Sequence, residues 1–471
     1  MSLPLPSPTV SYWQVPEHPL ASYRSTFPAT ADVVIIGSGI TGISVARTLF
    51  EQDPSLKVVI VEARKLCSGA TGRNGGHIKP GTPPLPKGAA LIVASYQNWP
   101  HRIEKYGLDE AIVLSRFESA HPAALVALAE KYNLQCDVRQ CETVDAYYDY
   151  AGLERAKAAA YAISQHIPEL IYQIVPGEEA QKEFRLSKSC VGGITYPAGQ
   201  LWPYKLVTQL AQILVDHGVN LQTETPATKV SKDGAQWRVE TPRGNILATK
   251  VVHATNGYIQ YLLPSFAKLI KPTRGHMTAQ LPPKSLSHPP LDRTYSFIYE
   301  DGKFDYFIQQ PAYDGSKLML GGGYHQDPHP TTFNDAQVSE TSQEYLQHQL
   351  PKVFHWEGED NSSARVHTRW TGIMGFSEDG FPWVGKLVDN LGGGEGQFVC
   401  AGYTGEGTTC IWILLSIGMP NALLCAETVA YMVLGKEPPN YFPRSYLLTE
   451  ARYKKALERS ERGVGVKRVK L

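Results

Sequence analysis

The chain has 471 residues, of which 42% are apolar and 19% charged, and its formal net charge is zero. This is the composition of a globular protein with room for two or three domains, and the balanced charge implies no polycationic surface, so nucleic acid is not an expected partner. The seven cysteines include no CxxC pair and no nearby set of histidines, so neither a metal site nor a disulfide framework is expected.

Targeting signals are weak in this sequence. The first 28 residues are rich in Pro and Ser and lack an apolar signal-peptide core. The longest apolar run, 411–419, is about half of the roughly 20 residues that span a bilayer. We therefore expect a cytoplasmic protein without a membrane partner. The final Val469-Lys470-Leu471 loosely resembles a peroxisomal signal, which makes the peroxisome the alternative location.

An irregular arm over residues 1–30 precedes the first regular pattern. A β-branched run over 32–36, helical spacing over 40–52 and a second apolar run over 57–62 predict a βαβ unit. Beyond a loop at 64–88, apolar spacing predicts helices near 89–106, 119–132, 151–165 and 203–217. Short strands are expected at 220–223, 227–232, 236–240 and 250–254. Alternation of apolar and polar residues over 270–325 predicts an antiparallel sheet. Residues 370–440 contain Gly-rich loops followed by a helix that ends near Leu434.

The turn between the first strand and the first helix reads Gly37-Ser38-Gly39-Ile40-Thr41-Gly42, a GxGxxG motif. Its glycines allow a tight turn, a close approach of phosphate to the backbone, and close packing of helix on strand. Free N–H groups and the helix dipole then favour phosphate at the helix N-terminus. Glu62 ends the second strand, 20 residues after Gly42, where a carboxylate accepts both ribose hydroxyls. These residues predict an adenine dinucleotide site without separating NAD from FAD.

The loop from Cys67 to His77 reads CSGATGRNGGH and indicates FAD. It resembles the loop that lies under the pyrophosphate and flavin in the D-amino-acid oxidase-like FAD-dependent oxidoreductases, most closely in their γ-glutamylputrescine oxidase-like branch. Further segments that resemble this family are 251–257, 370–372 with 379–385, and 401–405. The resemblance spans roughly residues 30–440 and implies FAD held without a covalent bond.

The resemblance also implies a set of cofactor contacts. Besides the fingerprint and Glu62, it assigns to FAD the residues Ala63, Arg64, Ser68, Gly69, Ala70, Thr71, Arg73, Asn74, Gly75, Gly76, Ala254, Thr255, Asn256, Gly402, Tyr403, Thr404 and Gly405. Small residues admit the flat ring, and the polar side chains of the loop supply donors for phosphate and ring oxygens.

The implied fold class is α/β, or α+β overall, with a Rossmann-like FAD-binding domain interleaved with an antiparallel-sheet substrate domain. The FAD-binding domain is expected at 31–110, 190–265 and 365–440, and the substrate domain at 111–189 and 266–364. Residues 1–30 form the arm, and residues 441–471 form a C-terminal tail.

Two positions depart from relatives that oxidise small amino acids. Met319 stands where sarcosine-type members have a lysine near the flavin, and Met374 stands where relatives hold the substrate carboxylate with an arginine. A desolvated carboxylate needs a paired cation, so a free α-amino acid is expected to be a poor substrate. Arg274 and Arg369 are candidates to replace the missing arginine, although each also fits an ordinary structural role.

A third departure lies in the C-terminal flavin loop. Residues 408–418 separate Gly407 from Met419, whereas relatives run directly from this loop into a helix that resembles Met419-Pro420-Asn421-Ala422. One explanation is a retained intron or shifted splice site in the gene model. The other is a genuine apolar insertion, which would displace the helix N-terminus from the flavin and weaken FAD binding.

The resemblance implies an enzyme that oxidises the C–N bond of an amine or N-substituted amino acid to an imine by hydride transfer to flavin N5, with O2 as the expected acceptor. The candidate catalytic residues are Tyr299, Tyr306, His276 and Trp370, because aromatic walls can stack an amine and a histidine can act as a base near neutral pH. Ordinary packing is the alternative for each. Other hypotheses are a related FAD dehydrogenase with a protein or quinone acceptor, and a flavin-binding protein inactivated by the 408–418 segment. The specific amine and the oligomeric state stay open.

Overall fold

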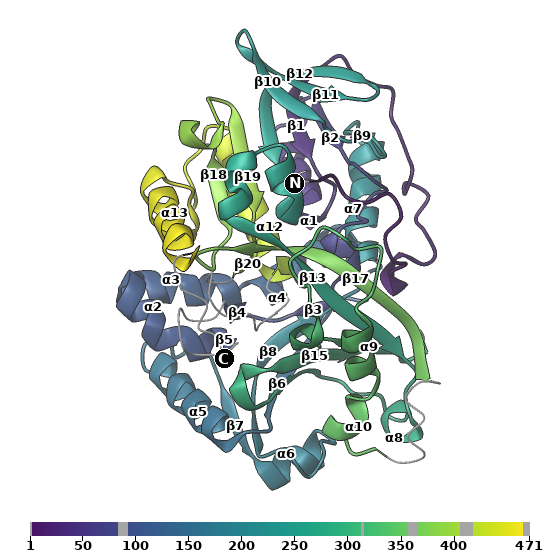
Figure 1. The fold of residues 1–471 in the computed structure, drawn as a ribbon, viewed down its shortest axis with the longest axis vertical. Helices are drawn as coiled ribbons and strands as arrows, with labels where there is room; N and C mark the ends of the chain where they lie inside the picture. The colour runs from purple at the N-terminus through teal and green to yellow at the C-terminus, as the bar shows by residue number, and fades with distance from the viewer. Residues whose placement is uncertain (1, 83–92, 312–314, 357–364, 406–417, 465–471) are drawn as a thin grey trace.

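The computed structural model describes residues 2–82, 93–311, 315–356, 365–405 and 418–464. Within these residues the chain forms an eight-stranded sheet, a ten-stranded sheet and a two-stranded pair, β4 (Gly81–Thr82) with β5 (Val93–Ala94). The two large sheets occupy the upper and lower halves of the molecule, and each combines segments from distant parts of the sequence (Figure 1). The predicted mixed α/β fold class is confirmed.

The eight-stranded sheet is built around β1 (Thr30–Ile36), which runs parallel to both neighbours, β2 (Val58–Val61) and β12 (Gly244–His253). Every residue of β2 is buried, as expected for a parallel strand covered on both faces. The sheet is completed by β9 (Asn220–Gln222), β10 (Lys229–Asp233), β11 (Gln236–Thr241), β18 (Trp383–Lys386) and β19 (Gln397–Ala401).

Helices α1 (Ile40–Gln52) and α12 (Gly418–Val433) pack on this sheet, and α7 (Pro203–Asp216) packs on α1. All residues of α1 from Ile40 to Leu49 are buried, because α1 lies between the sheet, α7 and α12. The predicted βαβ unit and the predicted helix at 203–217 are confirmed to within two residues. The strand expected at 250–254 is the end of the longer β12.

The ten-stranded sheet has the order β20-β17-β13-β16-β15-β14-β6-β8-β3, and β7 pairs with β8. Most pairs are antiparallel, as predicted for 270–325, but β14 runs parallel to β6, and β20 parallel to β17. The strands are β3 (His77–Ile78), β6 (Arg139–Tyr147), β7 (Gln173–Pro176), β8 (Gly192–Gln200), β13 (Ile270–Gln280), β14 (Thr294–Ile298), β15 (Phe304–Gln309), β16 (Leu318–Gly321), β17 (Val366–Ser377) and β20 (Thr404–Gly405).

The domain division expected at 190–265 and 365–440 stays a prediction, but the sheets differ from it in one respect. Strands β8 and β17 lie within those ranges, and both pair in the ten-stranded sheet rather than with the dinucleotide-type strands. They belong to the ten-stranded sheet because β17 pairs along most of its length with β13, and β8 pairs along its length with β6.

The ten-stranded sheet has two buried faces. Residues paired directly across strands share a face, and one such row runs through Trp370, Met277, Gly321, Tyr306, Ser296 and Asp145. We call this the inner face, because Met277 and Tyr306 pack in the same core as β1 and α1. The outer face carries Tyr295, Phe297 and Phe307 and is covered by α6 (Gly177–Glu183), α9 (Glu340–Gln347) and α10 (Leu350–Val353).

The α-helices between β5 and β7 differ in part from expectation. They are α2 (Trp99–Tyr106), α3 (Leu108–Ser119), α4 (His121–Lys131) and α5 (Tyr150–Ser164). Residues 93–94 form β5 and residues 95–98 a 3-10 turn, and α2 begins only at Trp99, where Pro100 suits a first turn. By length and composition alone the stretch Leu108–Lys131 could cross a membrane, but it is two helices, and half of its apolar window is buried inside the protein.

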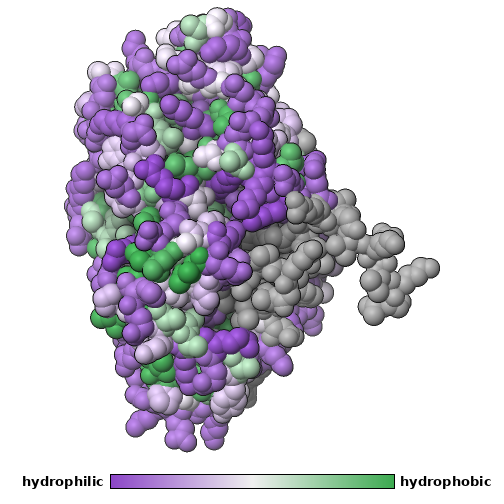
Figure 2. Space-filling model, turned by 90° about the vertical axis from the view of Figure 1, so that its left-hand side faces the viewer, coloured by the Kyte–Doolittle hydropathy of each residue, from purple (hydrophilic) through white to green (hydrophobic). Residues whose placement is uncertain are grey.

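Both flanking segments are more ordered than an arm and a tail suggest. The arm contains a 3-10 turn at Tyr12–Gln14, and Trp13 is buried. Within the tail, α13 (Glu450–Val464) is a helix, whereas the peroxisomal-type tripeptide lies outside the described residues. The side of the molecule in Figure 2 is largely hydrophilic with scattered apolar areas, which is ordinary for a protein surface.

Candidate FAD site and active centre

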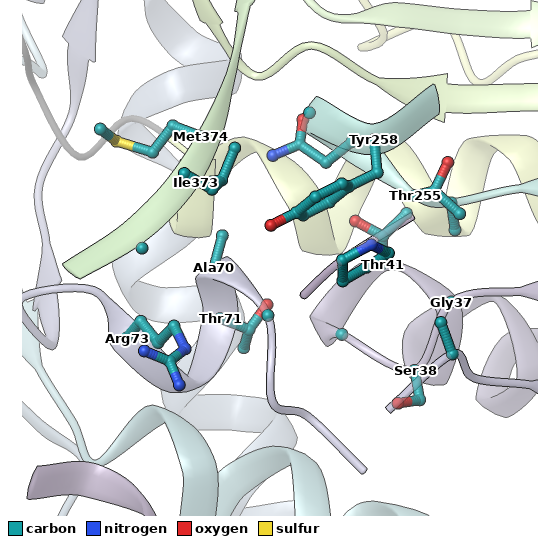
Figure 3. Close-up of a pocket in the computed structure, with 18 of the residues that line it drawn as sticks. Gly37, Ser38, Thr41, Ala70, Thr71, Arg73, Thr255, Tyr258, Ile373 and Met374 are labelled. Atoms are coloured by element: carbon teal, nitrogen blue, oxygen red, sulfur yellow. The ribbon is translucent and has the colours of Figure 1, made fainter. Parts of the chain in front are cut away.

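A cavity lies between the N-terminal end of α1, the 67–76 loop and the inner face of β13 and β17. Many of the predicted cofactor residues line it: Gly37, Ser38, Gly39, Ile40, Thr41, Glu62, Ala63, Arg64, Gly69, Ala70, Thr71, Arg73, Asn74, Ala254, Thr255, Asn256 and Tyr403. Figure 3 shows how the fingerprint, the loop and β17 surround the same space. The sequence motifs therefore converge on one site.

The fingerprint turn is closed by backbone contacts that only glycine allows. Gly37 has φ +110°, and a Cβ on Gly42 would lie 1.9 Å from the carbonyl oxygen of Gly37. Gly39 is the N-cap of α1 and makes no side-chain cap. The N–H of Ile40 donates to Thr71 Oγ1 at 3.1 Å, which ties the helix start to the second loop. The remaining N–H groups of this helix end suit a phosphate.

Glu62 stands at the end of β2, as predicted. Its Oε2 accepts from the N–H and the hydroxyl of Ser38 at 3.0 and 2.8 Å, and its Oε1 accepts from the N–H of Arg64 at 2.9 Å. These bonds hold the carboxylate in one orientation beside the fingerprint. Both oxygens retain lone pairs for ribose hydroxyls.

Arg73 lines the cavity, but its guanidinium does not point into it. The group donates to the carbonyls of Ser68, Thr9 and Thr371, each at 2.7 Å, and Figure 3 shows it turned away from Tyr258. Burial lowers the pKa of Arg73 to about 10, so the group is still charged at neutral pH. The predicted role of Arg73 as a donor to phosphate or flavin stays a prediction, and within the described protein its guanidinium connects the loop to Thr9 and Thr371.

Other predicted positions also act from outside the cavity. Within the described chain, Gly42, Ser68, Gly75, Gly76 and Gly402 are not on the cavity wall. Gly75 packs against the ring of Tyr306, and Gly402 donates its N–H to Asn256 Oδ1 at 2.9 Å. The backbone of Thr404 and Gly405 forms β20. Of the predicted insertion, residues 408–417 lie outside the described residues, and the chain resumes at Gly418 with α12.

Two buried polar atoms on the cavity wall test whether the site fits FAD. The hydroxyls of Tyr258 and Thr255 have no hydrogen-bond partner within the described protein, although both are buried. Buried polar groups are nearly always satisfied, so these two call for a polar ligand. Together with the glycine turn and the Glu62 carboxylate, the donors and acceptors fit an adenine dinucleotide, and the long cavity between the fingerprint and β17 fits FAD.

Tyr258 was not predicted from the sequence. It lies in the 3-10 turn Asn256–Tyr261, and its ring projects between Thr41 and Ile373 (Figure 3). Burial raises the pKa of Tyr258, so the phenol stays protonated and can donate. We expect Tyr258→Phe to weaken FAD affinity about tenfold, the scale of one lost hydrogen bond to a charged group. Titration of the apoprotein with FAD measures this, and the apoprotein Tm should not change.

The four candidate catalytic residues do not come together. Tyr306 lines the cavity. Trp370 is fully buried on the inner face and donates from Nε1 to the carbonyl of Arg73 at 2.8 Å, so it supports the loop. His276 and Tyr299 are on the outer face: His276 Nε2 lies 2.9 Å from Asp327 Oδ2, and Tyr299 donates to Asp305 at 3.1 Å. A strand alternates its side chains, so His276 points away from the side on which Met277 lies.

His276 therefore has a structural environment. Burial lowers its pKa from the usual 6.5, against the attraction of Asp327, so the folded protein favours the neutral ring. The unfolded chain then binds the proton first, and this residue reduces stability as the pH falls below 6.5. When the pH is lowered from neutral to mildly acidic, we expect the free energy of unfolding to fall less in His276→Gln than in the wild type. Denaturant unfolding at both pH values measures this, and the exposed His166→Gln should behave like the wild type.

Another part of the cavity wall comes from the ten-stranded sheet. Its members are uncharged: Gly275, Met277, Tyr306, Gly372, Ile373 and Met374. The sequence identified Met374 as a candidate substrate-side residue, whereas no sequence motif marks Met277 or Ile373 as part of the site. In the part of the chain that the structure describes, no group of three or more His, Cys, Asp or Glu residues could hold a metal ion.

Known proteins with related sequences and folds are oxidoreductases. A family model for FAD-dependent oxidoreductases (DAO) matches residues 32–414. The probable oxidoreductase OrdL of Rhizobium meliloti (strain 1021) is 24% identical over 445 residues, covering 90% of each chain. The gamma-glutamylputrescine oxidoreductase of Escherichia coli (strain K12) is 24% identical over 388 residues, covering 81% of each.

Solved structures agree on the fold. Glycine oxidase from Geobacillus kaustophilus has a TM-score of 0.67 at 19% identity, covering 90% of this chain and 99% of its own. L-proline dehydrogenase from P. horikoshii has a TM-score of 0.66 at 18% identity, covering 93% and 99%. The family match covers most of the chain and includes the fingerprint, the 67–76 loop and the sheet wall. The resemblance seen in the 67–77 loop is thereby confirmed, and this chain belongs to the DAO family of FAD-dependent oxidoreductases.

Proposed function

We propose that this enzyme oxidises the C–N bond of an amine, or of an N-substituted amino acid, to an imine that hydrolyses to a carbonyl compound, with O2 as the acceptor. FAD, when bound, supplies the chemistry by accepting a hydride from the substrate carbon. The choice of an amine over a free α-amino acid rests on one observation: the sheet wall of the cavity carries no charge.

The cations that a carboxylate would need are engaged elsewhere. Arg274 donates to both oxygens of Asp327 at 2.9 and 3.0 Å, and Arg369 is exposed and donates to Gln347. On the inner face, the ammonium of Lys79 is buried, pairs with Asp145 and donates to Ser296 Oγ at 2.6 Å. Neither predicted substitute for the missing arginine therefore reaches the wall, which favours a substrate end without a free carboxylate.

The wall residues position the substrate by shape. Tyr306 is buried, and burial raises its pKa, so the neutral phenol presents an aromatic surface rather than a base. Met277 and Met374 supply flexible apolar contact beside it. Met319 is fully buried between β13 and β15, so an apolar side chain fills the position of the family lysine. A dry wall of this kind favours the neutral amine, the form that can be oxidised.

The test is anaerobic reduction of the bound flavin. The purified holoenzyme is mixed with monoamines, diamines, γ-glutamylputrescine, sarcosine and glycine, and the visible flavin absorbance is followed. We expect an amine, or an N-substituted amino acid whose carboxylate lies away from the sheet wall, to bleach the flavin and glycine to leave it oxidised. Bleaching by glycine alone would contradict the proposal. Adding air then separates the acceptors, because an oxidase yields one peroxide per turnover and a dehydrogenase does not. Release of yellow flavin on acid precipitation tests the non-covalent attachment.

Met374→Arg is expected to bring back a carboxylate site. The side chain of Met374 is half-buried at the cavity, where a guanidinium can form a charge-assisted pair with a carboxylate. We expect glycine to bind about tenfold more tightly to this variant, as measured by perturbation of the flavin spectrum. Met374→Leu changes the shape slightly without adding charge and should not gain affinity. Equal glycine binding by all three proteins would show that Met374 does not face the substrate.

A further inference from the structure

The segment Leu3–Gln14 precedes residue 32, where the family match begins, yet it reaches the cofactor cavity. Leu3 and Pro4 line the cavity. The carbonyl of Leu5 accepts from Arg64 Nη1 at 3.1 Å, and the N–H of Arg64 donates to Glu62 Oε1. Leu3 and Pro4 share this cavity with Ile36 at the end of β1 and Ile40 at the start of α1. The beginning of the segment therefore lies at the adenosine end of the site, next to the predicted ribose ligand.

The rest of the segment is bonded to the 67–76 loop. Ser11 Oγ donates to the carbonyl of Gly72 at 2.7 Å, Trp13 Nε1 to that of Asn74 at 2.5 Å, and Gln14 Nε2 to that of Cys67 at 3.1 Å. Ser11 and Trp13 are buried. Each bond satisfies a loop carbonyl, so the segment is packed along the loop.

We propose that Leu3–Gln14 is part of the FAD site and acts as a strap that retains the cofactor. Leu3 and Pro4 close the adenosine end by apolar contact with the bound nucleotide, and the bonds from Ser11 to Gln14 fix the strap to the loop. A nucleotide leaving this end must displace Leu3 and Pro4. The strap therefore slows FAD release. The inference depends on FAD binding and not on the amine substrate, so the flavin-bleaching test can fail without affecting it.

The test compares two double variants of the holoprotein. Leu3→Ala with Pro4→Ala removes the apolar contact but keeps every strap-to-loop hydrogen bond. Pro6→Ala with Ser7→Ala alters two exposed residues of the same segment and serves as the matched control. FAD release is followed as free flavin in filtrates after dilution, and FAD affinity by titration of the apoprotein. Thermal unfolding of the apoprotein is recorded for each.

We expect the Leu3/Pro4 variant to release FAD about tenfold faster, the scale of a few lost buried methylene contacts, with an unchanged apoprotein Tm. The control should match the wild type in all three measurements. Unchanged release from the Leu3/Pro4 variant would overturn the proposal. A fall in apoprotein Tm as large as that of the holoprotein would also overturn it, because the two residues would then support the fold rather than the ligand.

Discussion

Replacing Gly42 with alanine is expected to abolish FAD binding and to lower the free energy of unfolding of the apoprotein by about 3 kcal/mol. The added Cβ would lie 1.9 Å from the carbonyl oxygen of Gly37, a contact that side-chain rotation cannot relieve. Gly37 cannot move freely, because it has φ +110° and lies against the carbonyl of Ala254. Helix α1 cannot move freely either, since it is buried on most sides. The turn must open, and the phosphate-facing N–H groups move with it.

The measurements are the ratio of visible flavin to protein absorbance in the purified protein and denaturant unfolding of the apoprotein. Gly69→Ala is the matched control for stability. It lies in the second loop of the same site, has φ −80°, and a Cβ there would meet no protein atom within 4 Å. Its apoprotein should be as stable as the wild type. A Gly42→Ala protein with full flavin content would show that the fingerprint turn does not position the cofactor.

The dinucleotide half of the site could be predicted because its signals are local. Strand β1, the glycine turn, α1 and β2 follow one another in the chain, and each is marked by its own periodicity or by glycine. The end of β2 then places Glu62 without any long-range information. The motif resemblance extended this to FAD, and the family match confirms it.

The substrate wall could not be predicted in the same way. In β13 and β15 nearly every residue is buried, because both faces of the ten-stranded sheet are covered. Apolar alternation therefore does not indicate which side chains face the cofactor. Which alternate side chains of β13 face the cavity is set by the pairing of β13 with β17, nearly 100 residues further along the chain. His276 and Met277 are neighbours in sequence and point to opposite faces, and only this register determines that Met277 is the one that faces the cavity.

The N-terminal strap shows a second limit. Residues 1–30 have no regular periodicity, so an irregular arm was the natural prediction. The partners of the strap are mostly backbone carbonyls of the 67–76 loop, and a carbonyl carries no sequence signal. The partners of Arg73 meet the same limit. A cation in a Gly-rich loop suggests a phosphate ligand, and its bonds to the carbonyls of Ser68, Thr9 and Thr371 carry no sequence signal.

Arg73→Met should therefore destabilise the protein whether or not FAD is bound. The methionine fills much of the same volume but removes a charged donor at 2.7 Å from each of the carbonyls of Ser68, Thr9 and Thr371. The carbonyls of Ser68 and Thr371 keep longer bonds, from Arg64 Nη2 at 3.3 Å and Thr9 Oγ1 at 3.4 Å. Each lost bond to a charged donor costs about 1 kcal/mol or more, so the free energy of unfolding of the apoprotein should fall by about 3 kcal/mol. Arg73 connects the strap, the loop and β17, and its loss should also weaken FAD binding by loosening the loop.

Arg369→Met is the matched control, because Arg369 is an exposed arginine on the same strand as Thr371, and its guanidinium donates to Gln347 rather than to a buried carbonyl. Its free energy of unfolding should stay within about 0.5 kcal/mol of the wild type. The two roles of Arg73 predict different results for the Arg73→Met apoprotein. If Arg73 binds phosphate directly, its loss lowers FAD affinity but leaves the apoprotein as stable as the wild type, since a buried cation without its ligand is unfavourable. If Arg73 anchors the loop, its loss lowers the stability of the apoprotein, and denaturant unfolding in the absence of FAD distinguishes the two.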